Sequence, residues 1–352
     1  MAQFAEMFFG DFEVTPYAGV GFVGGAKYNI SGFAGETATG GLINPAFQLE
    51  VSAEGRVYYG GVDVTNRPSV KEWLDRQGDI QPGFYRDFAG LSVEVGQVSV
   101  EGRSAFNGSV DNFGIPGVGD AFGSFVNSPG NITGNAGVDY QETYLKLETR
   151  LGRYWITETP SSFAPRAGLS IAGLAGLHLA GRNTDIRHNV DASFPAFGVN
   201  GILNARYFTD VEDNGVIPYL GVDFGQDWPL KNGAVLRTGI TARGGLSFNR
   251  WNAVDTLSAE GLGSIDRYNH ANLKGSSTSG YGSVSGHVGV DFATGWSAQV
   301  DAGIQHGLIR SPKVFRPDSV EVSPGNFELR DPDISFDAET TYTLSFSMRH
   351  RF

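Results

Sequence analysis

Hydrophobic and polar residues alternate without a break along the last eleven residues of the chain, Tyr342 to Phe352. The even positions hold Tyr, Leu, Phe, Met, His and Phe, whereas the odd positions hold only Thr, Ser and Arg. Successive side chains of a β-strand point to opposite faces, so this segment predicts one strand with an apolar face and a strongly polar face.

The same alternation recurs along most of the chain, in segments of about ten residues. In Ile43 to Ala53 the odd positions are Ile, Pro, Phe, Leu, Val and Ala, and the even ones are Asn, Ala, Gln, Glu and Ser. Mean hydropathy is only −0.17 because the apolar residues occupy every second position. This pattern is typical of strands that face lipid on one side and a polar interior on the other.

Four short segments between the alternating runs are read as tight turns. A two-residue turn brings its flanking residues onto the same face, and Glu54-Gly55, Gly96-Gln97 and Gly152-Arg153 each bring apolar residues together in this way. Residues 293–295, Ala-Thr-Gly, do the same for Phe292 and Trp296. Tight turns are therefore expected to alternate with longer connections.

This reading predicts about fourteen strands. They lie at 12–26, 43–53, 56–66, 86–95, 98–106, 138–151, 154–159, 165–180, 194–208, 216–226, 233–249, 279–292, 296–308 and 338–352. The long connections hold the Gly, Asn, Pro and Asp clusters typical of loops, near 27–42, 65–87, 107–136, 251–277 and 310–335. If two strands fuse the number becomes twelve, and a hairpin hidden in a loop would make it sixteen.

A terminal strand of this pattern that closes on phenylalanine resembles the closing strand of bacterial outer-membrane β-barrels. The resemblance is to a class, and only the last strand is a specific motif. It implies an all-β, antiparallel, up-and-down transmembrane barrel in a Gram-negative outer membrane, with short periplasmic turns and long extracellular loops. It also implies that the barrel-assembly machinery reads the C-terminal strand. Residues 1–11 are expected to form a periplasmic segment and 12–352 a single barrel.

Composition agrees with a membrane barrel. There are 50 Gly, 12% aromatic residues and no Cys, and the charged share of 18% is below the roughly 25% of soluble domains. A net charge of −12 disfavours nucleic-acid binding. The longest uncharged apolar run, 167–181, is too short for a membrane-spanning helix, which needs about 20 residues.

Two string matches to ligand motifs lack their structural context. Residues 19–24 read GxGxxG, but no helix that could carry phosphates follows them. Residues 210–215 resemble the start of a calcium loop, but Gly221 stands where the loop's last acid is required. A solvated turn is favoured for the second segment, and neither a cofactor nor a metal is expected.

The six histidines form no HExxH pair and no cluster with metal-ligand spacing. Outer-membrane barrels include hydrolases with His, Ser or Asp near the extracellular rim, but no segment here resembles their motifs. The chain is therefore expected not to be an enzyme, with an outer-membrane hydrolase kept as an alternative.

Charged residues of both signs fall on the polar face of the predicted strands and are expected to line the lumen. The candidates are Glu50, Glu94, Glu148, Arg166, Arg206, Asp223, Arg237, Arg243, Asp291 and Asp301. Such a lining suits either a hydrated pore or a packed salt-bridge plug. Loop 107–136 is a candidate for an inward-folded constriction, with an exposed loop as the equal alternative. Aromatic residues near strand ends are expected at the membrane interfaces, namely Tyr58, Tyr154, Phe292, Trp296 and Phe352.

The sequence therefore favours a porin-like channel for passive diffusion of small hydrophilic solutes or ions, with a bias to cations. The expected surroundings are outer-membrane lipids and lipopolysaccharide, and a monomer is favoured. The alternatives are a closed structural or adhesive barrel that acts through its extracellular loops, a hydrolase and a polysaccharide-export barrel.

Overall fold

The computed structural model describes twelve segments of the chain. They are residues 13–36, 42–66, 85–110, 130–158, 168–196, 199–230, 232–261, 264–292, 294–315, 320–323, 326–328 and 333–350. Within these segments no helix is long and apolar enough to cross a membrane.

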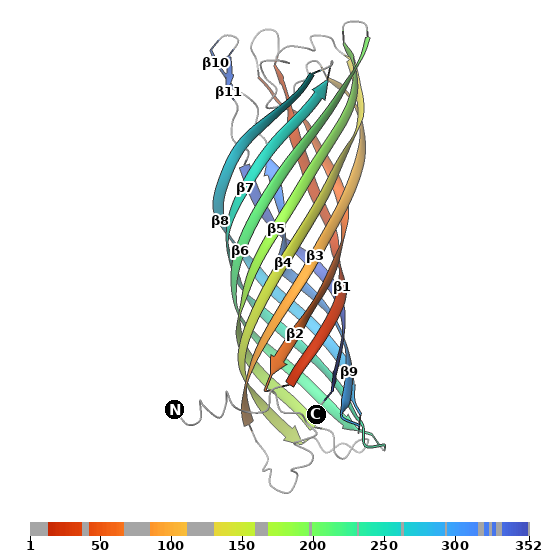
Figure 1. The fold of residues 1–352 in the computed structure, drawn as a ribbon, viewed down its shortest axis with the longest axis vertical. Helices are drawn as coiled ribbons and strands as arrows, with labels where there is room; N and C mark the ends of the chain where they lie inside the picture. The colour runs from red at the N-terminus through yellow and green to blue at the C-terminus, as the bar shows by residue number, and fades with distance from the viewer. Residues whose placement is uncertain are drawn as a thin grey trace.

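The described residues form one closed antiparallel barrel of ten strands, with a small separate hairpin (Figure 1). The barrel strands are β1 (Glu13–Glu36), β2 (Leu42–Thr65), β3 (Tyr85–Val110), β4 (Gly130–Glu158), β5 (Gly168–Ala196), β6 (Val199–Pro229), β7 (Val235–Gly261), β8 (Ser264–Asp291), β9 (Trp296–Phe315) and β12 (Asp333–His350). The hairpin consists of β10 (Val320–Ser323) and β11 (Asn326–Glu328). Around the barrel each strand pairs with its neighbours in the chain, and β12 closes the ring against β1.

The predicted number of fourteen strands is wrong, because four pairs of predicted strands are single long strands. Gly55 lies inside β2, Gly96 inside β3 and Gly152 inside β4, so the three two-residue turns do not exist. The predicted strand 216–226 and most of the predicted strand 194–208 are both part of β6, whereas residues 194–196 end β5. Only the turn at 293–295 is confirmed: Gly295 has φ 87 and its amide donates to the carbonyl of Phe292 at 3.1 Å.

At these positions the alternation of apolar and polar residues shifts by one residue. The shift occurs because each strand passes from a membrane into water. On β2 the outward residues change from Val62 and Tyr58 to Arg56 and Glu54, while Val57 is buried inside. On β3 they change from Val95 to Gln97 and Glu101. Strands of 24 to 31 residues, at about 3.3 Å per residue, are far longer than a membrane band of about 25 Å requires. The switch in pattern therefore marks the membrane boundary and not a turn.

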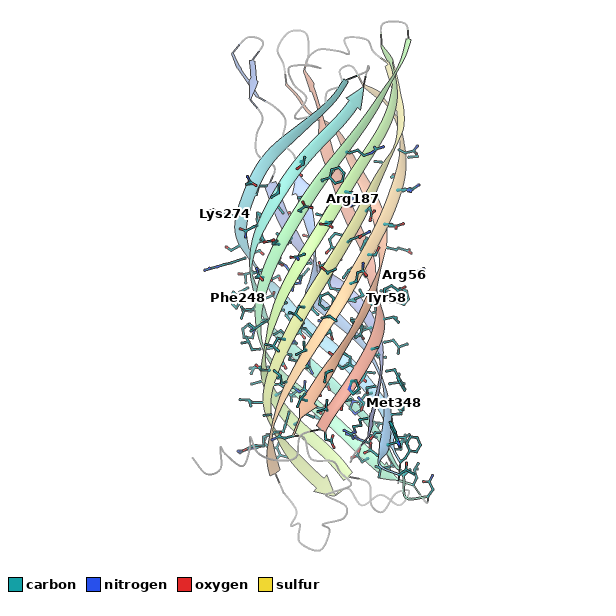
Figure 2. The ribbon with its side chains drawn as sticks, viewed as in Figure 1. Arg56, Tyr58, Arg187, Phe248, Lys274 and Met348 are labelled. Carbon is teal, nitrogen blue, oxygen red and sulfur yellow. The ribbon has the colours of Figure 1, made fainter. Side chains whose placement is uncertain are left out.

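An apolar belt surrounds the barrel on its outer face. Its members are exposed and come from all ten strands, including Phe22, Tyr58, Val95, Leu145, Leu179, Leu220, Phe248, Val284, Ile304 and Met348. Leu220 is 70% exposed, which is favourable in lipid and costly in water. Figure 2 shows Tyr58 and Phe248 at the upper limit of this belt, with Arg56, Arg187 and Lys274 beyond it.

The two ends of the barrel differ. The terminal end is where β1 begins and β12 ends, and the distal end is the opposite one, to which the strands extend beyond the belt (Figure 1). The connection between β2 and β3, within the predicted loop 65–87, lies at the terminal end, so the expectation that all long connections share one side is wrong. Most of the predicted loop 251–277 belongs to β7 and β8.

The distal parts of β9 and β12 leave the barrel wall. Pairing between β8 and β9 ends at Gly282 and His306, although β8 continues to Ser264. Pairing between β1 and β12 ends at Val23 and Thr341. Beyond these points β9 and β12 remain paired mainly with each other, and we call residues 307–315 and 333–338 the inner hairpin.

Candidate functional site: a lumen closed by the inner hairpin

Gly307 is the residue at which β9 turns inward. Its φ of 80 is in the left-handed region, which glycine adopts without penalty. An added Cβ would lie 2.1 Å from the carbonyl oxygen of Gly280, so the close approach to β8 also requires glycine. The β9–β12 register shifts between Ala338 and Thr340, and Leu308, Ile309 and Arg310 are all buried. The bulge therefore carries consecutive residues into the interior.

Side chains from the opposite wall hold this segment in the lumen. Arg182 of β5 donates to the carbonyl oxygen of Leu308 at 2.7 Å, and Tyr140 of β4 donates to the carbonyl oxygen of Arg310 at 3.4 Å. Backbone groups of β9 are thus within reach of strands four or five places away around the ring. The hairpin therefore lies inside the lumen, distal to the belt.

Asp213 of β6 contacts two arginines where the hairpin meets the opposite wall. Its Oδ2 accepts from Arg182 at 2.6 Å and from Arg310 at 3.4 Å. Arg310 also donates to Ser277 of β8 at 2.5 Å, and its guanidinium lies 4.6 Å from the centre of the Phe336 ring. Because these charges are almost fully buried, removing one partner would leave an uncompensated charge, at a cost of about 3–5 kcal/mol.

A second polar layer lies nearer the terminal end and consists of ion pairs, some between adjacent strands and some between strands two or three places apart around the ring. Lys146 lies 3.0 Å from Glu94, Arg150 lies 2.6 Å from Asp63, and Arg243 lies 3.1 Å from Glu148. Arg237 and Arg349 both contact Asp291, at 3.4 and 3.3 Å. The basic side chains of this layer are therefore neutralised by acids inside the same barrel.

Tyrosine rings in the lumen pack over glycines of adjacent strands. A Cβ on Gly96 would lie 2.3 Å from the Tyr144 ring, and a Cβ on Gly176 would lie 2.3 Å from the Tyr219 ring. The tyrosine hydroxyls then reach carboxylates: Tyr144 donates to Glu94 at 3.1 Å and Tyr219 to Glu148 at 2.5 Å. Part of the high glycine content is explained, because these glycines give the rings room.

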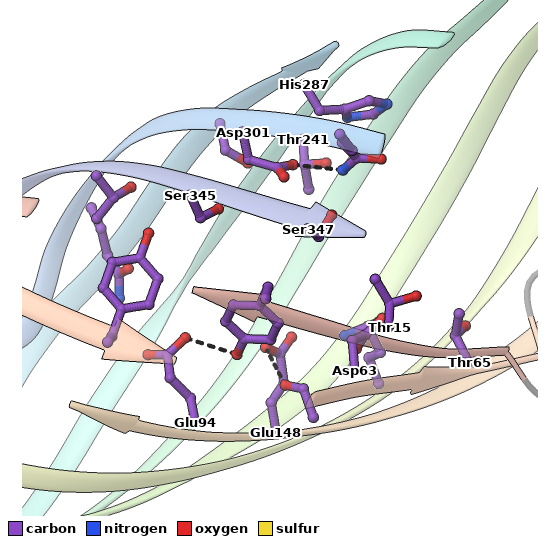
Figure 3. A pocket seen from close by; sticks show the side chains of 18 of the residues that line it. Thr15, Asp63, Thr65, Glu94, Glu148, Thr241, His287, Asp301, Ser345 and Ser347 are labelled. Atoms are coloured by element: carbon purple, nitrogen blue, oxygen red, sulfur yellow. Dashed lines mark hydrogen bonds and ion pairs between the residues drawn. The ribbon is translucent and has the colours of Figure 1, made fainter. Parts of the chain in front are cut away.

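A cavity of about 370 Å³ lies in the lumen between the inner hairpin and the terminal end. Leu308 and Ile309 line it from the hairpin. Figure 3 shows Ser345, Ser347 and Asp301 on one wall, with Glu94 and Glu148 on the facing wall. Its volume is in the lower part of the range for small-molecule sites, about 300–1,000 Å³.

Seven of the ten residues expected to line the lumen lie along this cavity. They are Glu94, Glu148, Asp223, Arg237, Arg243, Asp291 and Asp301. Arg206 does not join them, because it shares the strand alternation of the outward residues Phe208 and Asp210. Arg166 and the side chain of Glu50 lie outside the described part of the structure.

The residues that hold the inner hairpin were missed. Arg182, Asp213 and Arg310 fall in segments read as connections or turns, whereas they lie within β5, β6 and β9. A signal existed for Arg182, because the inward set His178, Ala180, Arg182 continues in phase. No such signal identifies Arg310, whose position depends on the bulge at Gly307.

Three of the five aromatic residues expected at the membrane interfaces have described side chains. Tyr58 is exposed at the distal limit of the belt, and Phe292 and Trp296 are exposed at the turn between β8 and β9. The side chain of Tyr154 and all of Phe352 lie outside the described residues, as do residues 1–12 and most of loop 107–136. Within the described residues, no group of three or more His, Cys, Asp or Glu side chains could hold a metal ion.

Comparisons with known proteins give only distant likenesses. No family model and no curated protein matches the chain. Among solved structures, the outer membrane protease OmpT of Escherichia coli has a TM-score of 0.32 at 12% identity, covering 96% of this chain and 97% of that one. The translocator domain of the autotransporter NalP of Neisseria meningitidis has 0.26 at 8%, covering 100% and 92%. A Pseudomonas aeruginosa FadL homologue has 0.23 at 10%, covering 96% and 90%.

The architecture of the barrel indicates what kind of protein this is. At the level of the belt the ten strands close into an antiparallel barrel, the outer face is apolar, and the charged residues face the lumen. The chain has the architecture of a membrane-spanning β-barrel.

Proposed function

We propose that this barrel is a channel for small hydrophilic solutes, closed in the described state and opened by displacement of the inner hairpin. The observation that carries the proposal is the cavity of about 370 Å³ directly beneath a segment that has left the barrel wall. By analogy with known outer-membrane barrels, the terminal end lies in the periplasm and the distal end outside the cell.

The hairpin is attached in a way that permits movement. Beyond His306 and Thr341 it has lost its strand pairing to β8 and, apart from a single bridge between Ser31 and Phe315, to β1. The contacts that hold it in place are made by side chains and include hydrogen bonds with Arg182, Asp213, Tyr140 and Ser277. Leu308 also packs in a cluster with Ile217, Tyr219 and Tyr281, and the Phe336 ring packs on Trp251. Side-chain contacts can be exchanged for water, whereas breaking a strand ladder would open the barrel itself.

Barrel width is compatible with a gated channel. Eight strands leave an interior that side chains just fill, and sixteen or more leave an open aqueous pore. Ten strands lie between these limits, so the lumen can be filled by one inserted segment and emptied by its removal. The network of ion pairs nearer the terminal end sets the width that remains.

The test is single-channel recording in planar bilayers with wild type, Arg310→Ala and Tyr140→Phe. We expect rare, brief steps from wild type and frequent ohmic steps from both variants, because each loses a contact that holds the hairpin. Arg187→Ala is the matched control, since Arg187 is exposed on the outer face, with its guanidinium 5.7 Å from the centre of the Phe208 ring. It should behave as wild type.

A permanently closed barrel that acts through its distal half is the second candidate. It is favoured by the burial of Arg310 and Asp213, whose opposite charges are paired with each other without any solute. Silence from Arg310→Ala and Tyr140→Phe, in protein shown to be folded by heat-modifiable migration, would exclude the channel and support this candidate.

A further inference from the structure

One wall of the cavity is rich in neutral hydroxyl groups. On β12 the inward positions are Thr341, Thr343, Ser345 and Ser347, and all four line the cavity. These are four of the odd positions of the C-terminal strand, so their hydroxyls follow the strand axis at every second residue. Across the neighbouring strands the wall continues with Thr15, Ser285, Gln299 and Gln305.

Several of these groups are available to a ligand. No hydrogen bond joins the side chains of Thr15, Ser285, Gln305 or Ser347 to another residue of the described structure. They are polar, they face the cavity, and Ser347 is only 8% exposed. Polar groups in such a position need water or a bound solute as their partner.

The charged residues of the cavity are in a different situation. Lys146, Arg150 and Arg243 each have a carboxylate within 3.1 Å, and Arg237 and Arg349 share Asp291. Asp301 accepts a hydrogen bond from the neutral Gln299 at 2.8 Å. Away from Asp301, an ion entering the cavity would have to break one of these pairs or go without a counter-charge. The lining therefore weakens the cation bias expected from net charge alone, because most of the lining charge is already compensated where the solute would lie.

Tyrosine rings supply an apolar surface beside the hydroxyl wall. Tyr17 is the register partner of Ser347 on the adjacent strand, and Tyr59 hydrogen-bonds with Ser345 and Thr343. The Tyr17 and Tyr59 rings meet edge-on, with centres 6.4 Å apart, and both line the cavity together with Tyr144. An aromatic surface that adjoins neutral hydrogen-bonding groups suits a molecule that has both C–H faces and hydroxyl groups.

We propose that the cavity binds a neutral polyhydroxylated solute of about monosaccharide size, with Ser347, Ser285, Gln305 and Thr15 as hydrogen-bonding groups and the tyrosines as the packing surface. The inference deepens the proposed function, since it names the class of solute that the channel would pass. The binding site can nevertheless be tested without any measurement of conduction.

The experiment is saturation-transfer NMR and thermal unfolding of the folded protein in detergent, with glucose, glucitol and, as charged comparators, potassium gluconate and glucosamine hydrochloride. We expect saturation transfer and a rise in unfolding temperature with the two neutral compounds only. Ser347→Val and Gln305→Leu should each weaken binding about tenfold, the loss of one good hydrogen bond of about 1.4 kcal/mol. Ser276→Val is the matched control, because Ser276 is exposed on the outer face of β8.

The outcomes separate the two proposals. Binding of neutral solutes with silence from the hairpin variants would keep the site and overturn the channel. Conduction by Arg310→Ala without binding of either neutral solute would keep the channel and overturn the solute class. Equal binding by Ser347→Val, Gln305→Leu and Ser276→Val, or tighter binding of the charged comparators, would also overturn the assignment.

Discussion

Arg310 of β9 lies 3.4 Å from Asp213 of β6, although three strand boundaries separate β9 from β6 around the barrel wall. This contact is possible only because β9 turns inward at Gly307. It joins the hairpin that closes the lumen to the wall that faces it, and it makes the closed state dependent on a few identifiable side chains.

Gly307→Ala should increase the open fraction. A left-handed backbone with a Cβ costs about 1–2 kcal/mol, and this Cβ would also contact the carbonyl of Gly280. The closed state should lose a factor of about 5–30 in population relative to the open state. Gly282→Ala is the control, because its nearest contact would be 3.8 Å away. Channel recordings in which both variants match wild type would contradict a hinge at Gly307.

Closure should depend on pH through Glu142. This residue lies distal to the belt, between the exposed Gln141 and Thr143, and outside the membrane-spanning part of β4. Burial raises the pKa of its carboxyl to about 7, against the downward effects of Arg182 and of a hydrogen bond from Tyr140, while Asp213 raises it further. Arg310, whose carbonyl accepts from Tyr140, completes the charged groups around it.

The sign follows from the two states. When the hairpin is displaced, water reaches Glu142 and its pKa returns toward 4.5, so the closed state binds the proton more tightly. Protonated Glu142 stabilises the closed state fully below about pH 4.5, and this stabilisation is lost as the pH rises through about 7. We expect more frequent opening at pH 8 than at pH 5 in recordings. Glu142→Gln should remove most of this difference; an unchanged pH profile in that variant would argue against Glu142.

Gly96→Val should destabilise the barrel. The new side chain would occupy the position of the Tyr144 ring and break its hydrogen bond to Glu94, so overpacking should cost about 1–3 kcal/mol. Gly137→Val, whose nearest contact is 3.5 Å from the added Cβ, should cost less. Urea unfolding in lipid vesicles measures both, and equal costs would show that the Tyr144 contact is not limiting.

The belt boundary should be visible in the cost of adding charge to the outer face. Leu220→Lys lies inside the belt and should cost about 2–4 kcal/mol, because the ammonium would face hydrocarbon. Ser276→Lys lies on the outer face of β8 distal to the belt, where Ser276 pairs with the exposed Arg250, and should cost close to nothing. The same unfolding measurement applies. Similar costs at both positions would mean that the phase change does not mark the membrane limit.

Alternation along the chain determined the all-β class, the membrane barrel and the inward position of residues such as Glu94 and Asp291, because a two-residue period fixes the face of every side chain within a strand. Alternation could not determine the number of strands. A phase change at Gly96 looks the same whether the chain turns back or passes out of lipid, and only the pairing of β3 with β4 along its whole length distinguishes the two.

Only the tertiary structure decided that a segment of β9 lies inside the lumen. The inward turn of β9 depends on a left-handed glycine, on the loss of pairing with β8, and on Arg182, Asp213 and Arg310 meeting from three strands. Contacts between residues about 30 to 130 positions apart leave no periodic trace in the sequence. The chain by itself therefore specified which residues face inward, and the folded barrel determined which of them meet.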